Sequence, residues 1–228
     1  MLKKMFRFIK DTNPSLMKTA CLSVLILASF SACSGGAFTQ VITDGRESYR
    51  SATLTDAFRA DGIALLTATG GGTENKKLLG DIVEEVVKAE RPDVRIIPYW
   101  KNLSIINMSG LTADYAGMLK EYELTGILNR DALKKLKDAV GVMYFLQPRL
   151  VSFEQTQAGR FSLLGLSIIK THESRIKVYL ELWNAATGEI LWIGVGDATI
   201  ASENYRAKPI PFETAARFAV KQIAAKIP

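Results

Sequence analysis

The alternation of apolar and polar residues along the chain predicts a mixture of strands and helices. Short apolar runs bounded by glycine or proline, at residues 62–69 and 94–98, are typical of buried strands. Between them, apolar residues recur at helical spacing over residues 73–89, with charged residues opposite, which predicts an amphipathic helix. We expect a short helix over residues 112–122, and a stronger one over residues 129–140 that begins after the N-cap residue Asn129.

The second half of the chain predicts three strands and a last helix. Residues 142–146 are apolar without alternation, as in a central strand covered on both faces, and this strand is expected to continue to Phe153. Residues 175–200 predict a hairpin around the turn at residues 185–188. A helix is expected to begin at Pro211, because proline is favoured at the first helical position.

The register of this hairpin follows from matching its apolar residues. If Asn184 faces Glu189, one face of the hairpin is wholly aliphatic. The pairs on that face are Leu182 with Leu191, Leu180 with Ile193, and Val178 with Val195. The other face then gathers four large apolar residues, Tyr179, Trp183, Ile190 and Trp192.

These elements predict an α/β fold of the α+β sandwich type. The expected core is a mixed sheet of about five strands with helices packed on it. The order is strand, helix, strand, two helices, three strands and a helix, with residues 99–111 as a loop. Residues 59–228 are expected to form one domain, preceded by a tether and lead-in segment over residues 33–58.

The N-terminal leader has the three parts of a secretory signal peptide. Lys18 precedes an apolar run, and the run ends on the small residues Ser31 and Ala32 before Cys33. The run is too short for a transmembrane helix, which needs about 20 apolar residues. Residues 1–32 are therefore expected to be removed, with translation starting at Met1 or at Met17.

The cysteine after these small residues resembles the lipobox of bacterial lipoproteins. The resemblance implies attachment of diacylglycerol to Cys33, cleavage before it and acylation of the new N-terminus. Ser34, rather than aspartate, resembles the residue that sorts such proteins to the outer membrane. The alternative is an ordinary signal peptide followed by a chance cysteine.

Charge and composition narrow the possible partners. The whole chain has 29 basic and 23 acidic residues, but the leader holds five basic residues and one acidic residue. The mature chain thus keeps 24 basic and 22 acidic residues, a net charge of +2. This charge is too small to predict a basic surface that binds nucleic acid. The mature chain has no cysteine besides Cys33, so no disulfide is expected within it.

Two stretches resemble the curli-secretion lipoprotein family. They are NRDALKKLKDAVGVMYFL from residue 129, followed by RLVSFE from residue 149, and RIKVYLELWNAATGEILW from residue 175. The same core occurs in lipoprotein activators of penicillin-binding proteins and in the N-terminal domain of the Tol-system propeller protein. The resemblance implies a small α/β domain that makes protein contacts at the outer membrane without catalysis.

In that family, inserted hairpins from each subunit build a membrane pore. The corresponding insert here is residues 157–171, and its 15 residues are fewer than two membrane-crossing strands of about 9–11 residues require. We therefore expect a docking loop, containing Phe161, Leu163 and Leu164, rather than a pore. The alternative is that the loop packs on its own domain.

No set of residues predicts catalysis, a metal or a nucleotide. His172, the only histidine, has no thiols or carboxylate cluster around it and is expected to be a surface residue at a strand end. Ser109 lacks the nucleophile-elbow pattern, and the neighbouring Glu84 and Glu85 are expected to face solvent. Gly70-Gly71-Gly72 fits neither phosphate-loop pattern and is expected to be a plain turn.

The expected function is therefore that of an outer-membrane lipoprotein facing the periplasm, a non-enzymatic adaptor or assembly factor for an envelope or secretion complex. A protein partner or self-association is expected, through the aromatic face or the insert. We expect no cofactor besides the covalent lipid, no small-molecule substrate and no metal. The first alternative is a ring-forming subunit of a secretion channel of the curli-secretion type, and a less favoured one is a periplasmic enzyme.

Overall fold

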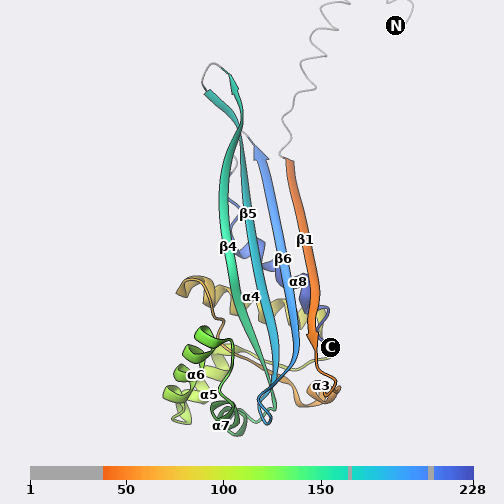
Figure 1. Ribbon diagram of the computed structural model, residues 1–228, viewed down its shortest axis with the longest axis vertical. Helices are drawn as coiled ribbons and strands as arrows, with labels where there is room; N and C mark the ends of the chain where they lie inside the picture. Colours follow the sequence, from red (N-terminus) through yellow and green to blue (C-terminus); the bar gives the residue numbers. More distant parts are fainter. Residues whose placement is uncertain (1–37, 164–165, 205–207) are drawn as a thin grey trace, which may run out of the picture. The chain divides into compact units, whose positions relative to one another are not determined.

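A six-stranded sheet forms the centre of the structure, a computed structural model that describes residues 38–163, 166–204 and 208–228. The side chains of Phe38, of residues 159–170 and of Asn204 are also outside this description. The strand order is β1-β6-β5-β4-β2-β3 (Figure 1). β1, β6, β5 and β4 are mutually antiparallel, whereas β2 runs parallel to β3 and β4. The strands are β1 (Phe38–Arg50), β2 (Ile63–Leu65), β3 (Ile96–Ile97), β4 (Tyr144–Leu163), β5 (Leu166–Asn184) and β6 (Glu189–Asn204).

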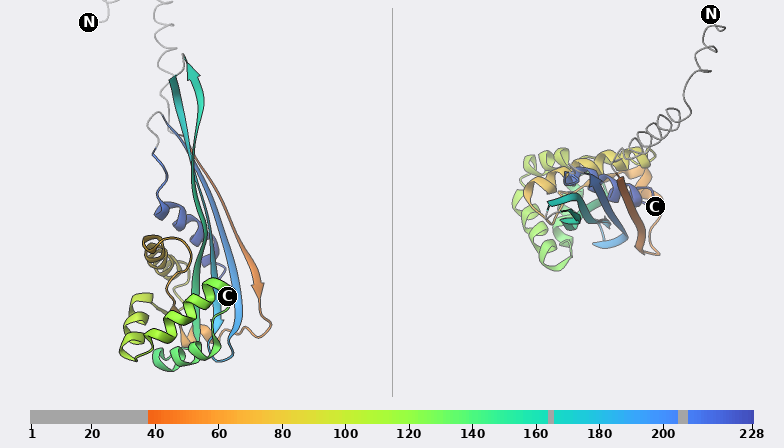
Figure 2. Two further views of the ribbon diagram at one scale, coloured as in Figure 1. Left: turned by 60° about the vertical axis from the view of Figure 1, so that its left-hand side comes forward. Right: turned by 90° about the horizontal axis from the view of Figure 1, so that it is seen from above.

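Helices cover both faces of this sheet near one end. α4 and α8 pack on one face, while α5, α6 and α7 gather on the other, at the end away from the β4–β5 turn (Figures 1 and 2). The helices are α3 (Ala57–Asp61), α4 (Thr73–Glu90), α5 (Tyr99–Met108), α6 (Thr112–Thr125), α7 (Arg130–Val140) and α8 (Phe212–Ala224). The predicted α/β class with a mixed sheet is therefore confirmed.

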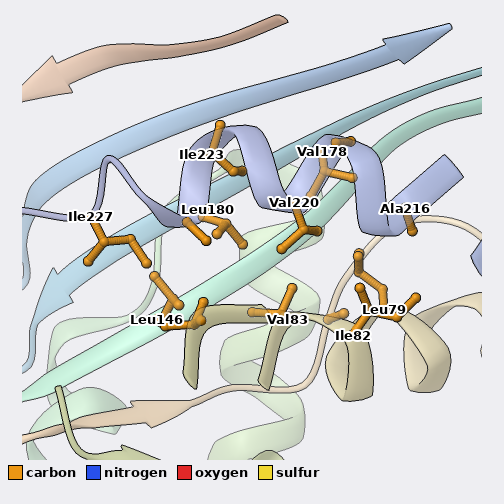
Figure 3. Packing of buried hydrophobic residues seen from close by; sticks show 14 of the residues in the cluster. Leu79, Ile82, Val83, Leu146, Val178, Leu180, Ala216, Val220, Ile223 and Ile227 are labelled. Carbon is orange, nitrogen blue, oxygen red and sulfur yellow. The ribbon is translucent and has the colours of Figure 1, made fainter. Parts of the chain in front are cut away.

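The larger apolar core lies between the sheet and the pair α4 and α8. Side chains from the two helices meet over Val178 and Leu180 of β5 (Figure 3). The helical residues are Leu79, Ile82 and Val83 of α4 and Ala216, Val220 and Ile223 of α8. Each of these residues is almost fully buried. Each buried aliphatic side chain contributes about 1.5–3 kcal/mol, so this core holds the two helices on the sheet.

Glycines let α8 approach the sheet closely. A Cβ at Gly196 of β6 would lie 2.2 Å from the Ala219 carbonyl oxygen of α8. A Cβ at Gly45 of β1 would lie 2.4 Å from the Gln222 carbonyl oxygen. Because any larger residue would push the helix away, these two positions set the distance between α8 and the strands.

The smaller core lies on the opposite face, beneath α6 and α7. Alternation along the strands separates the two cores, since Leu182 belongs to the first and its neighbour Trp183 to the second. Leu133 and Leu136 of α7 are fully buried in this second core. Asn129 caps α7 as predicted, because its Oδ1 accepts hydrogen bonds from the amides of residues 131 and 132, each at 3.1 Å.

Two segments differ from the sequence-based predictions. Residues 38–50, expected in the tether and lead-in segment, form β1 and pair with β6, so the folded unit begins at Phe38 rather than at residue 59. Most of β1 is polar because only part of it lies under α8, and alternation is therefore a weak signal there. Residues 99–108, expected in a loop, form α5, which buries only Asn102 and Ile106.

The insert at residues 157–171 is not a loop. β4 and β5 continue through it as an antiparallel ladder, from Gln157 opposite His172 to Leu163 opposite Leu166. The segment is therefore the end of one long hairpin, and the expected docking loop is absent from the residues described there. Gly159, near the base of this segment, pairs with Lys170 within the ladder and does not form a turn.

A bulge changes the predicted register of the β5–β6 hairpin. Asn184 does face Glu189, but the register shifts between Leu182 and Trp183. Beyond the shift, Leu182 faces Trp192, Leu180 faces Gly194, and Val178 faces Gly196. The predicted wholly aliphatic pairing is therefore wrong, because β6 presents a tryptophan and two glycines to α8 where aliphatic residues were expected.

Candidate interaction surfaces

The outer edge of β1 is one candidate surface. β1 pairs with β6 along its inner side, from Phe38 to Arg50, and no other strand of the described chain pairs with its outer side. Val41, Ile42 and Tyr49 are partly exposed on this strand, Ile42 by 58%. An unpaired edge carries free backbone donors and acceptors, so it can accept a strand from another chain.

The outer edge of β4 is the second candidate surface. β2 pairs with β4 only at residues 144–146, and an isolated bridge joins Thr69 to Arg149. From Val151 to Leu163 no strand among the described residues pairs with the outer side of β4. The pairs β4–β5, β5–β6 and β6–β1 are all antiparallel. The strands β4 and β1, which carry the two free edges, therefore run in opposite directions.

The sheet face away from α4 and α8 is charged rather than apolar between these edges. Asp197 of β6 accepts contacts from Arg46 at 3.1 Å and from Lys177 at 3.3 Å. Arg175 and Glu173 form a further pair at 2.5 Å on β5. Such exposed pairs contribute little stability, typically about 0–1 kcal/mol each, so this face is a solvated surface.

The aromatic patch expected on this face is not formed. Trp183 and Trp192 are both buried, and they lie on opposite faces of the sheet. The bulge beside Trp183 causes this separation, because it moves Trp192 toward α4 and α8. Tyr179 and Ile190 are half-buried. The prediction of Tyr179, Trp183, Ile190 and Trp192 as one open interface is therefore wrong for this chain.

A buried carboxylate lies beside Trp183. Glu181 is only 4% exposed, and its Oε2 accepts a hydrogen bond from the Trp183 indole at 3.2 Å. Burial raises the pKa of Glu181, although the Tyr122 hydroxyl and the Arg149 guanidinium nearby act in the opposite sense. The pKa of Tyr122 is also raised, mainly by burial and secondly by the negative charge of Glu181. Arg149 lies 4.9 Å from the centre of the Tyr179 ring, as in a cation–π contact.

The glycine turn before α4 has a packing role. Gly70 and Gly71 have positive φ angles of 78° and 68°, which favour glycine. A Cβ at Gly70 would lie 2.0 Å from the Leu150 carbonyl oxygen, so the turn packs directly on β4. The Lys76 ammonium beside the turn already pairs with Glu123 at 2.7 Å. The glycines thus serve to pack this turn against β4.

His172 is not the surface residue that we expected. It is 7% exposed, because it lies within β5 and pairs with Gln157 on one side and Ser202 on the other. In the part of the chain that the structure describes, no group of three or more histidine, cysteine, aspartate or glutamate residues could hold a metal ion.

The remaining predicted residues lie at or beyond the limits of the description. Cys33, Ser34 and Leu164 are outside the described residues. Phe161 is the third residue from the end of β4, and Leu163 is its last residue. Only the backbone of these two residues is described. No helix among residues 38–163, 166–204 and 208–228 is both long and apolar enough to cross a membrane.

Comparison with known proteins gives only distant likenesses. No protein-family model matches the chain, and no curated protein matches it. A PelC dodecamer from Paraburkholderia phytofirmans is 13% identical with a TM-score of 0.44, over 81% of this chain and 96% of that one. The lipoprotein GNA1162 from Neisseria meningitidis is 11% identical with a TM-score of 0.35, over 62% and 83% of the respective chains.

A third solved structure, the LpoB C-terminal domain from Salmonella enterica, is 14% identical with a TM-score of 0.35, over 60% of this chain and 82% of that one. Likenesses of this degree carry no argument about what this chain does. The resemblance to the curli-secretion family therefore stays a prediction from the sequence.

Proposed function

We propose that this protein is a lipid-anchored lipoprotein of the bacterial outer membrane that faces the periplasm and acts by binding protein, not by catalysis. Cys33 is the attachment point of the lipid, and Ser34 is the sorting residue. The folded unit that begins at Phe38 is then an adaptor or assembly factor.

The free edge of β1 carries this proposal. It offers 13 residues of strand whose outer side pairs with no strand among the described residues, and Ile42 and Val41 add apolar contact area. Natural sheets usually cover, shorten or charge such an edge, since an uncovered one pairs with other chains. The second half of β1 is charged, with Asp44, Arg46, Glu47 and Arg50, whereas residues 38–43 carry no charge and leave a stretch that can pair with another strand. A partner strand added here gains main-chain hydrogen bonds along its length. The proposed adaptor needs no cofactor and no small-molecule substrate.

Replacing the anchoring cysteine tests the proposal. We expect Cys33→Ala to move the protein from the membrane fraction to the soluble periplasmic fraction, because the lipid is its attachment to the bilayer. The matched control is Cys21→Ala, which removes the other cysteine and should leave the protein in the membrane fraction. Membrane retention of Cys33→Ala equal to that of the unaltered protein would contradict the proposal.

The second candidate function is a ring-forming subunit of a secretion complex. The opposite directions of the two free edges favour it, since β1 of one copy can pair antiparallel with β4 of the next while all copies keep one orientation. Repeated head-to-tail contacts of this kind close into a ring when the rotation between successive copies closes, and extend into a filament when it does not. The stoichiometry of the detergent-extracted protein tests this candidate: a single fixed multiple supports it, and a monomer at every concentration excludes it.

A further inference from the structure

The outer side of β4 changes from covered to free at one point. Residues 66–69 continue β2 along it, and the Leu150 amide donates a hydrogen bond to the Thr69 carbonyl at 2.8 Å. At Gly70 the chain turns away into α4, and from Val151 onward no described strand pairs with this side. In Figure 1, β4 forms one outer edge of the long strands and β1 forms the other. A strand added to β4 therefore has to end at the turn.

A cavity of about 500 Å³ lies where the free edge begins, and we call it the Arg149 cavity. Its lining includes residues of the turn, of α4, of α6 and of β4, namely Gly70, Gly71, Lys76, Glu123, Arg149 and Val151. Lys76 and Glu123 form an ion pair at 2.7 Å, so their charges cancel. Arg149 therefore leaves the lining with one net positive charge.

Arg149 has no anionic partner among the described residues. Its guanidinium lies 4.9 Å from the centre of the Tyr179 ring and 5.9 Å from that of the Tyr122 ring. Its Nε is buried and has no hydrogen-bond acceptor in the described chain. The charge of Arg149 acts on Glu181, but burial raises the pKa of Glu181 and so disfavours its ionised form. Because a buried donor without an acceptor is costly, the cavity is suited to an anion that Arg149 can bind.

The neighbouring edge indicates which anion this is. A strand that runs parallel to β4 from the cavity would place its N-terminal amine there, whereas an antiparallel strand would place its C-terminal carboxylate there. A guanidinium binds a carboxylate through two parallel hydrogen bonds and repels an amine, so the cavity selects the antiparallel strand. Val151, which is 46% exposed, lines the same cavity and offers an apolar contact to the last side chain of that strand.

We propose that β4 binds the C-terminal segment of a partner protein as an added antiparallel strand, with the partner's terminal carboxylate on the guanidinium of Arg149. Main-chain hydrogen bonds along residues 151–158 supply affinity, and the carboxylate fixes the register of the added strand. This site goes beyond the proposed function, because neither the lipid on Cys33 nor the edge of β1 takes part in it. It is an alternative to the pairing of β4 with β1 of a second copy, since both would occupy one edge.

Retention of synthetic peptides tests the proposal. The detergent-extracted protein is immobilised and offered a pool of short peptides of random sequence, half with a free C-terminal carboxylate and half amidated. We expect the retained peptides to be enriched at least about tenfold in the free-acid form, because amidation removes the charge-assisted pair with Arg149. We also expect them to end in an apolar residue. An absence of retained peptides, or equal retention of the acid and amide forms, would overturn the inference.

Substitutions of Arg149 locate the site. Arg149→Gln should lower the affinity for the best-retained peptide at least about tenfold, and Arg149→Lys, which keeps the charge but not the planar fork, should lower it less. Arg130→Gln is the matched control, because Arg130 is exposed at the start of α7 and does not line the cavity. Equal affinities of Arg149→Gln and the unaltered protein would refute the carboxylate contact.

A change in the peptide tests the added strand without altering the fold of the protein. N-methylation of every backbone amide in the best-retained peptide removes its main-chain donors but keeps its carboxylate. We expect this peptide to bind at least about tenfold more weakly, because it cannot pair with β4. Unchanged binding would contradict the added strand. The Cys33→Ala protein should bind the unmodified peptide as tightly as the lipidated protein does, so this proposal and the lipid anchor can fail separately.

Discussion

At the scale of single residues, glycines at a few positions determine how closely helices and turns pack on the strands. Gly196 and Gly45 lie under the backbone of α8, and Gly70 lies under the backbone of β4. The sequence showed these glycines but not what they face, because the approach of a helix to a strand depends on residues far apart in the chain. By contrast, the Asn129 cap was predictable because all its partners are local.

Gly196→Ala should destabilise the protein by about 1–3 kcal/mol, the usual cost of overpacking, because α8 must move away from β6. Gly117→Ala is the matched control. Gly117 lies in α6, and a Cβ there meets nothing within 4 Å, so alanine should stabilise the helix by about 0.5–1 kcal/mol. Urea unfolding of both variants measures the two effects. A neutral Gly196→Ala would contradict the close packing of α8.

Glu181 should make stability depend on pH. Burial raises its pKa in the folded protein above the ordinary 4.5, so its protonated form favours folding. This contribution is fully present below pH 4.5 and is lost as the pH rises through the folded-state pKa. We therefore compare the free energies of unfolding of Glu181→Gln and of the unaltered protein, measured with urea. The difference between them should change in favour of Glu181→Gln as the pH is raised from 4 to 8. A relative loss over that range would contradict the direction of the shift.

At the scale of elements, predictions held where the signal is local and periodic. The strands around Phe145 and Leu180 and the helices α4, α7 and α8 follow from such patterns. β1 was missed because an edge strand with one solvated face carries mostly polar residues. Trp192 lies on the sheet face that α4 and α8 cover, and not on the opposite face as predicted. This was missed because a bulge adds one residue to a ladder without any glycine or proline to signal it. The free edges could not be predicted, since they depend on which strands remain unpaired.

The edge of β1 should respond to added charge. We expect Ile42→Lys to weaken self-association or partner binding at least tenfold, because it loses an apolar contact of about 1.5–3 kcal/mol and places a charge at the interface. Ile127→Lys is the matched control, since Ile127 is similarly exposed but lies after α6. Sedimentation of the two detergent-extracted variants compares them. Equal effects of the two substitutions would exclude a specific role of β1.

At the scale of the whole molecule, the proposed lipid anchor precedes a sheet with two edges that no described strand covers. The folded unit begins at Phe38, five residues after Cys33, so the proposed lipid would tether it through a short segment. Such a short tether suits a protein that presents a surface at a fixed height better than one that collects partners at a distance. The charged sheet face and the packed glycine turn leave the edges as the favoured contacts.

The intact mass of the mature protein, purified from membranes in detergent, distinguishes a lipid-anchored protein from an unmodified one. We expect a chain of 196 residues that begins at Cys33 and carries diacylglycerol and a further acyl group on that residue. An unmodified mature chain, or one that begins at any other residue, would contradict it.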